Sequence, residues 1–207
     1  MFDPARIDML MALRGRGVSD NAVLRGMELV SRKAFVPEQM RDKAYADHAL
    51  PLACGQSISA PFDMAIMAQM LELSPTSKVL EIGTGSGYHA AVMAQTVTRV
   101  YSVERYHALL KSSEANFKTE NIHNVVTRHG DGRYGWPGQA PFDRILITCG
   151  VRAVPDSLLE QLAAGGILVA SVDGHLTIVK KARVRLETKS IMPLELPMIE
   201  AGKSKIL

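Results

Sequence analysis

A glycine-rich turn follows a short apolar segment at Val79–Gly87, which reads VLEIGTGSG. Gly83, Gly85 and Gly87 let the backbone turn sharply and approach a ligand without an intervening Cβ atom. The next apolar segment ends at Glu104, whose carboxylate can accept hydrogen bonds from both hydroxyls of a ribose. A glycine turn after one strand, with an acid at the end of the next strand, predicts a nucleotide-type binding site.

The spacing of the glycines distinguishes a dinucleotide from other ligands that contain a nucleoside. Dinucleotide-binding turns follow G-x-G-x-x-G, whereas this turn is G-x-G-x-G and continues into Tyr88 and His89. Glu81 precedes the turn, where its carboxylate would repel the pyrophosphate of a dinucleotide. S-adenosylmethionine has a sulfonium, an ammonium and no phosphate, so we expect it as the cofactor.

A second acid lies in the sequence GDG at Gly130–Gly132, after a third apolar segment. In a nucleoside site, the carboxylate of Asp131 can accept a hydrogen bond from the amino group of adenine. The same sequence is also typical of a plain turn. The residues alone leave both interpretations open.

Short apolar segments alternate with helical ones through the centre of the chain, which predicts β-α-β units and a mostly parallel sheet covered on both faces. The expected strands are Lys78–Ile82, Val100–Val103, Asn124–Arg128, Arg144–Thr148 and Gly166–Val172. The expected helices start at Pro61, lie near His89–Gln95, span Tyr106–Glu120 and lie around Pro155–Leu162. Because parallel strands end at one edge of a sheet, the glycine turn and both acids should lie together.

The two ends of the chain have other patterns. Two amphipathic segments before residue 30 predict N-terminal helices, and Tyr45–Ser59 is expected to be an ordered loop. His175–Leu186 alternates apolar and basic residues, as antiparallel strands exposed on one face do. We predict one domain over residues 1–207, with a helical cap and active-site loop (1–60), a cofactor-binding α/β core (61–174) and an antiparallel tail (175–207).

The composition is that of a globular protein: 47% of the 207 residues are hydrophobic and 22% are charged, which excludes a disordered chain. The formal net charge of +3 forces no nucleic-acid groove. The apolar stretch Leu162–Val172 is well short of the ~20 residues that a membrane helix needs. The N-terminal sequence MFDPARIDML has an acid and no apolar run, unlike a signal peptide.

The two cysteines, Cys54 and Cys149, lie far apart in the sequence and form neither a metal-ligand spacing nor a disulfide framework. We therefore expect a cytoplasmic protein with no metal and no membrane contact. Cys54 lies beside Gly55, but no partner base is visible, so a small buried residue is the better interpretation. His48 and His89 border the expected site and are interpreted as polar residues rather than catalytic bases.

Segments over most of the chain resemble the protein-L-isoaspartate O-methyltransferase family, within the class I S-adenosylmethionine-dependent methyltransferases. They are Phe35–Pro37, Ala44–Leu52, Gly55–Pro61, Val79–Tyr88, Val100–Arg105, Asn124–Gly132, Gly135–Trp136, Pro141–Thr148 and Gln161–Val169. The most specific is GQSISAP at Gly55–Pro61, which is similar to the family segment that carries the active serine. The resemblance implies an α/β fold with a doubly wound, mostly parallel seven-stranded sheet, Rossmann-like, with an N-terminal helical cap and antiparallel C-terminal strands.

The resemblance also implies a reaction. Such enzymes methylate the α-carboxylate of L-isoaspartyl residues in damaged peptides and proteins, and the ester collapses to a succinimide that can hydrolyse to aspartate. By matching positions, Ser59 is the expected active serine. The expected cofactor contacts are Gln56, Ser57 and Ile58 in the loop, Glu81, Gly83 and Gly85 near the methionine, Glu104 at the ribose, and Asp131 and Gly132 at the adenine.

Three segments depart from the family pattern: Cys149–Arg152, Ala170–Gly174 and the chain after Met192–Leu194. They fall where the peptide would bind, so two alternatives stay open: another carboxyl or small-molecule methyltransferase, and a cofactor-binding homologue without turnover. A third, RNA methylation, is suggested by the basic residues of the tail, but no aromatic platform accompanies them. We expect isoaspartyl peptides and proteins as partners, no nucleic acid, and a monomer.

Overall fold

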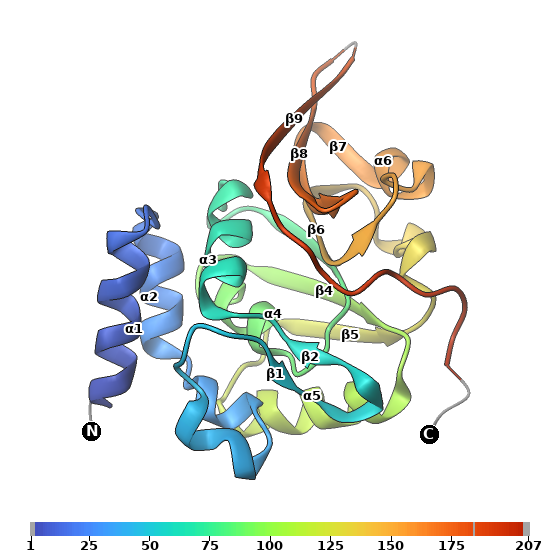
Figure 1. Ribbon diagram of the computed structural model, residues 1–207. Helices are drawn as coiled ribbons and strands as arrows, with labels where there is room; N and C mark the ends of the chain where they lie inside the picture. Colours follow the sequence, from blue (N-terminus) through green and yellow to red (C-terminus); the bar gives the residue numbers. More distant parts are fainter. Residues whose placement is uncertain (1–2, 184, 205–207) are drawn as a thin grey trace.

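The computed structural model describes residues 3–183 and 185–204, and its centre is a seven-stranded sheet in the order β5-β4-β3-β6-β7-β8-β9 (Figure 1). Neighbouring strands from β5 to β7 run parallel, and β8 and β9 are antiparallel. The strands are β3 (Lys78–Ile82), β4 (Arg99–Glu104), β5 (Val125–His129), β6 (Phe142–Val151), β7 (Leu162–Val172), β8 (His175–Lys181) and β9 (Leu186–Pro193). This arrangement confirms the expected fold class.

The central strands are apolar on both faces because helices cover both. Val79 and Val100 join the core cluster that also contains the N-terminal helices, whereas Leu80 and Val103 join a second cluster with Leu158. Successive side chains of a strand point to opposite faces, so an unbroken apolar run is what a sheet covered on both sides requires.

Helices α3, α4 and α5 cover one face of the sheet, and α1 and α2 pack outside them; α6 covers the other face at β7 (Figure 1). Their bounds are α1 (Pro4–Gly15), α2 (Asn21–Leu29), α3 (Pro61–Met70), α4 (Tyr88–Met93), α5 (His107–Thr119) and α6 (Asp156–Gln161). Capping residues and a proline fix where three of these helices begin. Asp3 and Asp20 accept hydrogen bonds from backbone N–H groups in the first turns of α1 and α2, and Pro61 is the first residue of α3.

The segment expected as a loop contains a small hairpin, because β1 (Leu50–Pro51) pairs with β2 (Ser57–Ile58). Two short 3-10 helices, η1 (Arg32–Phe35) and η2 (Glu38–Lys43), lie between α2 and the hairpin. A third, η3 (Ala53–Gly55), forms the turn between its two strands. Two more, η4 (Gly132–Tyr134) and η5 (Pro137–Gln139), follow β5. The hairpin is held away from solvent on one side, since Leu50 and Ile58 are buried.

The chain after β9 follows a path that the sequence pattern did not predict. It continues as an irregular C-terminal segment, residues 194–204, that returns across the edge of the sheet where the parallel strands end (Figure 1). The antiparallel pairing expected over His175–Leu186 is confirmed, with β8 ending at Lys181 and β9 beginning at Leu186. The expected exposure of one face is wrong for β8, because its consecutive residues Leu176–Val179 are all buried. Among the described residues, no helix has both the length and the apolar character needed to cross a bilayer.

Candidate functional site

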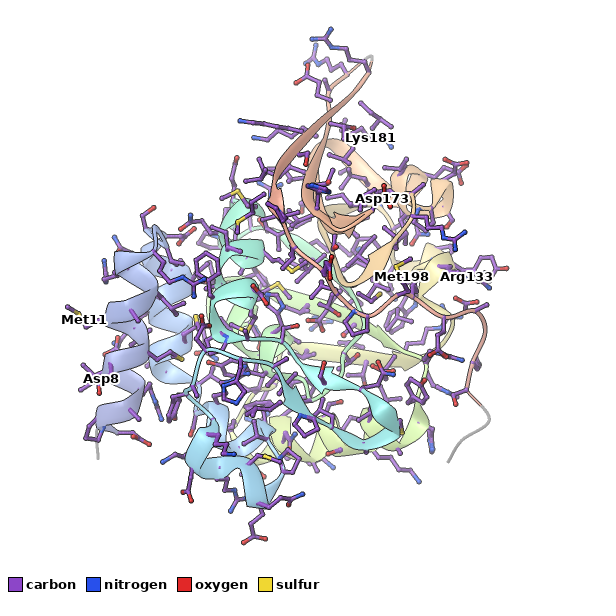
Figure 2. The ribbon with its side chains drawn as sticks, viewed as in Figure 1. Asp8, Met11, Arg133, Asp173, Lys181 and Met198 are labelled. Carbon is purple, nitrogen blue, oxygen red and sulfur yellow. The ribbon has the colours of Figure 1, made fainter. Side chains whose placement is uncertain are left out.

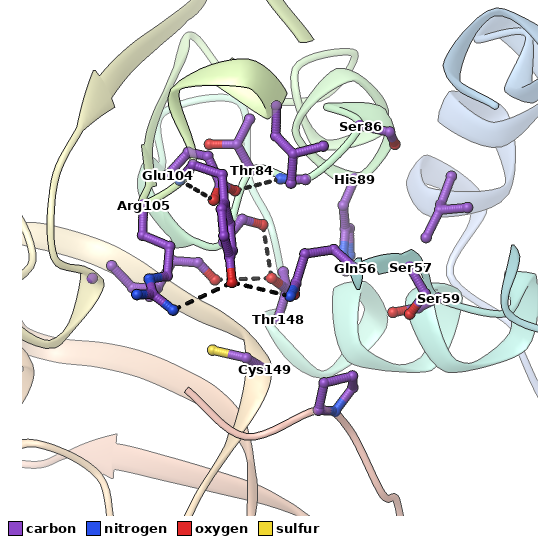
Figure 3. Close-up of a pocket in the computed structure, with 18 of the residues that line it drawn as sticks. Gln56, Ser57, Ser59, Thr84, Ser86, His89, Glu104, Arg105, Thr148 and Cys149 are labelled. Carbon is purple, nitrogen blue, oxygen red and sulfur yellow. Dashed lines mark hydrogen bonds between the residues drawn. The ribbon is translucent and has the colours of Figure 1, made fainter. Parts of the chain in front are cut away.

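A pocket lies at the carboxyl edge of the parallel strands, between the glycine turn, the end of β4, the hairpin loop and the C-terminal segment (Figure 3). This is the edge at which open α/β sheets bind ligands. The residues expected in the site that line this pocket are Gln56, Ser57, Ile58, Ser59, Gly83, Gly85, Glu104 and Gly132. Glu81 and Asp131 do not belong to the pocket wall.

The glycine turn is held close against β6. Gly83 has φ +94°, and a Cβ atom there would lie 2.4 Å from the Thr148 hydroxyl oxygen. That hydroxyl donates to the carbonyl oxygens of Ile82 and Gly83, at 2.8 and 2.7 Å. Only glycine combines this backbone conformation with so close an approach.

Glu104 is buried at the end of β4, and its carboxylate is fixed by backbone donors. Its Oε2 accepts from the N–H of Gly85 at 2.8 Å, and its Oε1 accepts from the N–H of Tyr106 at 2.9 Å (Figure 3). Each carboxylate oxygen can accept a further hydrogen bond. The arrangement therefore presents an oriented acceptor at the pocket edge, as a ribose requires.

Glu81 lies behind the pocket wall rather than in it. Its Oε2 accepts from the Ser102 hydroxyl at 2.5 Å, and the Ser102 and Thr84 hydroxyls are 2.6 Å apart. Burial raises the pKa of the Glu81 carboxyl to about 8; the Ser102 hydrogen bond opposes this rise, and the Glu104 charge adds to it. Because Thr84 lines the pocket, Glu81 can act on a ligand only through these two hydroxyl groups.

Asp131 does not line the pocket but accepts hydrogen bonds from residues beside it. Its Oδ2 accepts from Arg133 Nη2 at 2.8 Å and from the N–H of Gly202 at 2.7 Å. Burial acts to raise the pKa of Asp131, but the hydrogen bonds from Arg133 and Gly202 lower it overall. The neighbouring Gly132 does line the pocket, beside Ile82 and Ile199.

The hairpin loop forms the opposite side of the pocket. In Figure 3, Ser57 and Ser59 lie across the view from Glu104 and Arg105. The N–H of Leu52 donates to the carbonyl of Gln56 at 2.7 Å, which closes the hairpin. The loop thus holds its two serines on the pocket wall, close to the start of α3.

The C-terminal segment completes the pocket and was missed by the sequence analysis. The N–H of Gly150 donates to the carbonyl of Pro197, and the N–H of Ile199 donates to the carbonyl of Gly150, both at 2.8 Å. Glu200 forms an ion pair with Arg105 and accepts from the Tyr106 hydroxyl. Met198, labelled in Figure 2, lines the pocket from this segment. No local pattern marks the segment, since its contacts are all long-range.

Thr148, Cys149 and His89 also line the pocket. The first two could have been found from sequence, because Thr148 is the last residue of a predicted parallel strand and Cys149 follows it. Burial raises the pKa of the Cys149 thiol to about 12, which keeps it protonated and a poor nucleophile. Burial also lowers the pKa of His89 to about 3, so its ring is neutral.

The pocket chemistry fits S-adenosylmethionine. Two carboxylates, Glu104 and Glu200, line it, and its one lining cation among the described residues, Arg105, is paired with Glu200. A pocket with this charge balance suits a cationic ligand and lacks the free cations that a pyrophosphate needs. Apolar side chains at Ile82 and Ile199 offer surfaces for an adenine ring.

Comparisons with known proteins agree on one family. The family model described as protein-L-isoaspartate(D-aspartate) O-methyltransferase matches residues 5–195. A protein-L-isoaspartate O-methyltransferase of Maricaulis maris is 54% identical over 171 residues, covering 83% of this chain and 80% of the relative. One of Paramagnetospirillum magneticum is 42% identical over 205 residues, covering 96% of each chain.

Solved structures support the same fold. A protein-L-isoaspartate O-methyltransferase superposes with a TM-score of 0.84 at 27% identity, covering 95% of this chain and 66% of that one. A Plasmodium falciparum structure, described as a β-aspartate methyltransferase in complex with S-adenosyl-L-homocysteine, gives a TM-score of 0.79 at 22% identity, covering 93% and 97%. The expected family and cofactor are thereby confirmed. This chain belongs to the protein-L-isoaspartate(D-aspartate) O-methyltransferase family of S-adenosylmethionine-dependent enzymes.

Proposed function

We propose that this protein methylates the α-carboxylate of L-isoaspartyl residues in damaged peptides and proteins, and that Ser59 orients this carboxylate. The observation that carries the proposal is the position of Ser59 on the wall of the pocket that also contains Glu104. Membership of the family supports the reaction. The product ester can then close to a succinimide, which starts the return to aspartate.

The chemistry requires positioning more than proton transfer. A carboxylate with an ordinary pKa near 4 is already ionised at neutral pH, so no strong base is needed. S-adenosylmethionine supplies the methyl group on a sulfonium. The neutral ring of His89 and the protonated thiol of Cys149 offer neither a strong base nor a thiolate. Alignment of the reacting atoms and exclusion of water then account for the rate.

Ser59 is suited to this alignment because a hydroxyl can donate one hydrogen bond to a carboxylate oxygen. The second oxygen then stays free to attack. In this role the serine forms no covalent bond to substrate. It fixes which oxygen faces the methyl group, which is a requirement of an in-line displacement.

The remaining assignments concern the cofactor. Gly83 and Gly85 hold its methionine part, with Glu81 acting through the hydroxyls of Ser102 and Thr84. We assign the ribose to Glu104. The loop contacts are Gln56, Ser57 and Ile58. We assign the adenine to Gly132, with Asp131 beside the wall holding the N–H of Gly202.

A methyl-transfer assay with an isoaspartyl peptide and its normal aspartyl twin tests the reaction. We expect transfer to the isoaspartyl peptide alone. The Ser59→Ala variant should lower kcat by about 10- to 100-fold, because one positioning contact is lost. Its Kd for S-adenosylmethionine, from calorimetry, should stay close to the original value. Ser112→Ala, on the exposed side of α5, is the matched control.

Three other results would contradict the proposed reaction or the proposed role of Ser59. Equal transfer to both peptides would favour a less specific carboxyl methyltransferase. Cofactor binding without transfer to the isoaspartyl peptide would favour a homologue that has lost turnover. Equal losses in kcat and cofactor affinity on Ser59→Ala would remove the orienting role of Ser59.

Three basic residues of the tail form ion pairs or hydrogen bonds within the protein. Lys180 forms an ion pair with Glu72 at 2.7 Å, and Arg185 forms one with Glu187 at 2.9 Å. The Lys181 ammonium donates to two backbone carbonyls. Each of these three cations has a partner within the protein, so we assign no nucleic-acid binding to this part of the tail.

We further propose that the enzyme acts in the cytoplasm as a monomer, and that residues 1–207 form one methyltransferase domain. Cys54 and Cys149 are unpaired, which suits a reducing compartment. One core cluster joins residues from the N-terminal helices, the sheet and the tail, such as Leu13, Val169 and Leu194. A single cooperative unfolding transition would be the expected behaviour.

A further inference from the structure

An arginine lies buried beneath the hairpin loop without an acidic partner. Arg32, the first residue of η1, is 0% exposed, and none of the ion pairs among residues 3–183 and 185–204 includes it. Burial lowers its pKa, yet a guanidinium stays charged at neutral pH. The Asp47 carboxylate favours the charged form, but Asp47 forms its ion pair with Arg16. A buried charge without an ion-pair partner in contact is unfavourable. Something other than simple packing must account for its position.

The guanidinium joins the two ends of the loop. Arg32 Nε donates to the carbonyl oxygen of Ala44, and Nη2 donates to the carbonyl oxygen of Ser59, each at 2.7 Å. Ala44 and Ser59 bound the segment that carries the other proposed loop contacts. One side chain therefore closes this segment and binds the peptide group of the orienting serine itself.

The same side chain also contacts the element that follows the glycine turn. The Arg32 guanidinium carbon lies 5.0 Å from the centroid of the Tyr88 ring. Tyr88 is the first residue of α4 and lines the pocket. Arg32 thus connects the serine side of the pocket to the cofactor side through a rigid planar group.

We propose that Arg32 is a positioning residue that sets the orientation of Ser59 toward the substrate carboxylate. The inference rests on the proposed function. A guanidinium presents several N–H donors in one fixed plane, so it can bind two carbonyls at a set separation; an ammonium is a single flexible donor group. The charge is retained in Arg32→Lys, but this fixed geometry is lost.

The test compares Arg32→Lys with the unchanged enzyme on the isoaspartyl peptide. A displacement of the serine of about 1 Å should lower kcat by about 10- to 100-fold. The Kd for S-adenosylmethionine should change by no more than about threefold, because Glu104 and the glycine turn are held by bonds that do not involve Arg32. Arg32→Gln, which keeps a donor and removes the charge, is the second variant should the lysine variant fold poorly.

Arg144→Lys is the matched control. Arg144 also donates to backbone carbonyls of a distant segment, those of Leu71 and Glu72, but neither of these residues lines the pocket. Its substitution should lower the melting temperature, because the same kind of hydrogen bond is lost, and leave kcat nearly unchanged. A double variant separates positioning from general stability: in the Ser59→Ala background, Arg32→Lys should cause little additional loss of kcat.

Three results would overturn the inference: full kcat in both Arg32 variants, parallel losses of kcat and cofactor affinity, or an effect of Arg32→Lys that adds fully to that of Ser59→Ala. These outcomes differ from failure of the proposed function. If the unchanged enzyme does not methylate the isoaspartyl peptide, the substrate assignment fails. If it does so and Arg32→Lys is as active, only the positioning role fails.

Discussion

The carboxylate of Glu104 binds the backbone N–H groups of Gly85 and Tyr106, one from the glycine turn and one from the start of α5. It thereby does two things at the residue scale. It holds the turn against the end of β4, and it presents acceptors to the pocket. Hydrogen bonds to a charged group contribute about 1.5–3 kcal/mol each, so this residue should matter for affinity.

Glu104→Gln tests that expectation. The amide has one acceptor oxygen, so one backbone N–H loses its partner and the ribose loses a charged acceptor. We expect Kd for S-adenosylmethionine to rise by about 10- to 100-fold. At saturating cofactor, kcat should change much less. Calorimetry and steady-state kinetics give both values, and Glu160→Gln, an exposed change on α6, is the control. An unaltered Kd would exclude Glu104 from the binding role.

At the scale of elements, the C-terminal segment is held to the sheet edge by backbone bonds at Gly150. The fit is tight, because a Cβ atom on Gly150 would lie 2.7 Å from the carbonyl oxygen of Leu196 and 3.1 Å from the sulfur of Met198. A backbone atom cannot move aside as a flexible side chain can. Any side chain at position 150 must therefore displace the segment.

Gly150→Ala should loosen the pocket wall without touching the glycine turn. Overpacking of this kind costs about 1–3 kcal/mol, so cofactor Kd should rise by about tenfold. Trypsin should also cleave faster at the exposed Lys203. Gly138→Ala, where a Cβ atom would meet nothing within 4 Å, is the matched control. If both variants bind and resist trypsin alike, the segment does not support the pocket.

At the scale of the whole molecule, two buried groups link stability to pH. The pKa of Glu81 rises from 4.5 to about 8 on burial, so Glu81 stabilises the fold at low pH and loses that contribution as pH rises through this window. The pKa of His89 falls from 6.5 to about 3, so its contribution is present above 6.5 and is lost as pH falls. Between about pH 4.5 and 6.5 the two effects oppose each other.

The Glu81 effect should therefore be seen alone between pH 6.5 and 8. There the free energy of unfolding should fall by on the order of 1 kcal/mol per pH unit because the unfolded chain has released the proton that the native carboxyl keeps. Glu81→Gln cannot ionise and should remove this slope in urea unfolding experiments. A slope equal in both proteins would mean that another group titrates. Glu187→Gln is the exposed control.

Much of this molecule follows from local patterns in the sequence. Unbroken apolar runs predicted the parallel strands because only a sheet covered on both faces buries them fully. The loop around Ser59 was assigned to the site only through the resemblance to a known family. The glycine turn and Glu104 at the end of the next strand were placed at one edge because parallel strands end together. These inferences need only short-range periodicity and one rule of topology.

Tertiary structure decided the features that depend on contacts between distant segments. Whether Glu81 faces the ligand or the core depends on which way the last residues of β3 point, and the structure turns it to Ser102, 21 residues away. Arg32 reaches Ser59 across 27 residues, and Glu200 reaches Tyr106 across 94. Local propensity contains no information on such pairings, because their free energy arises only once the chain has folded and brought the partners together.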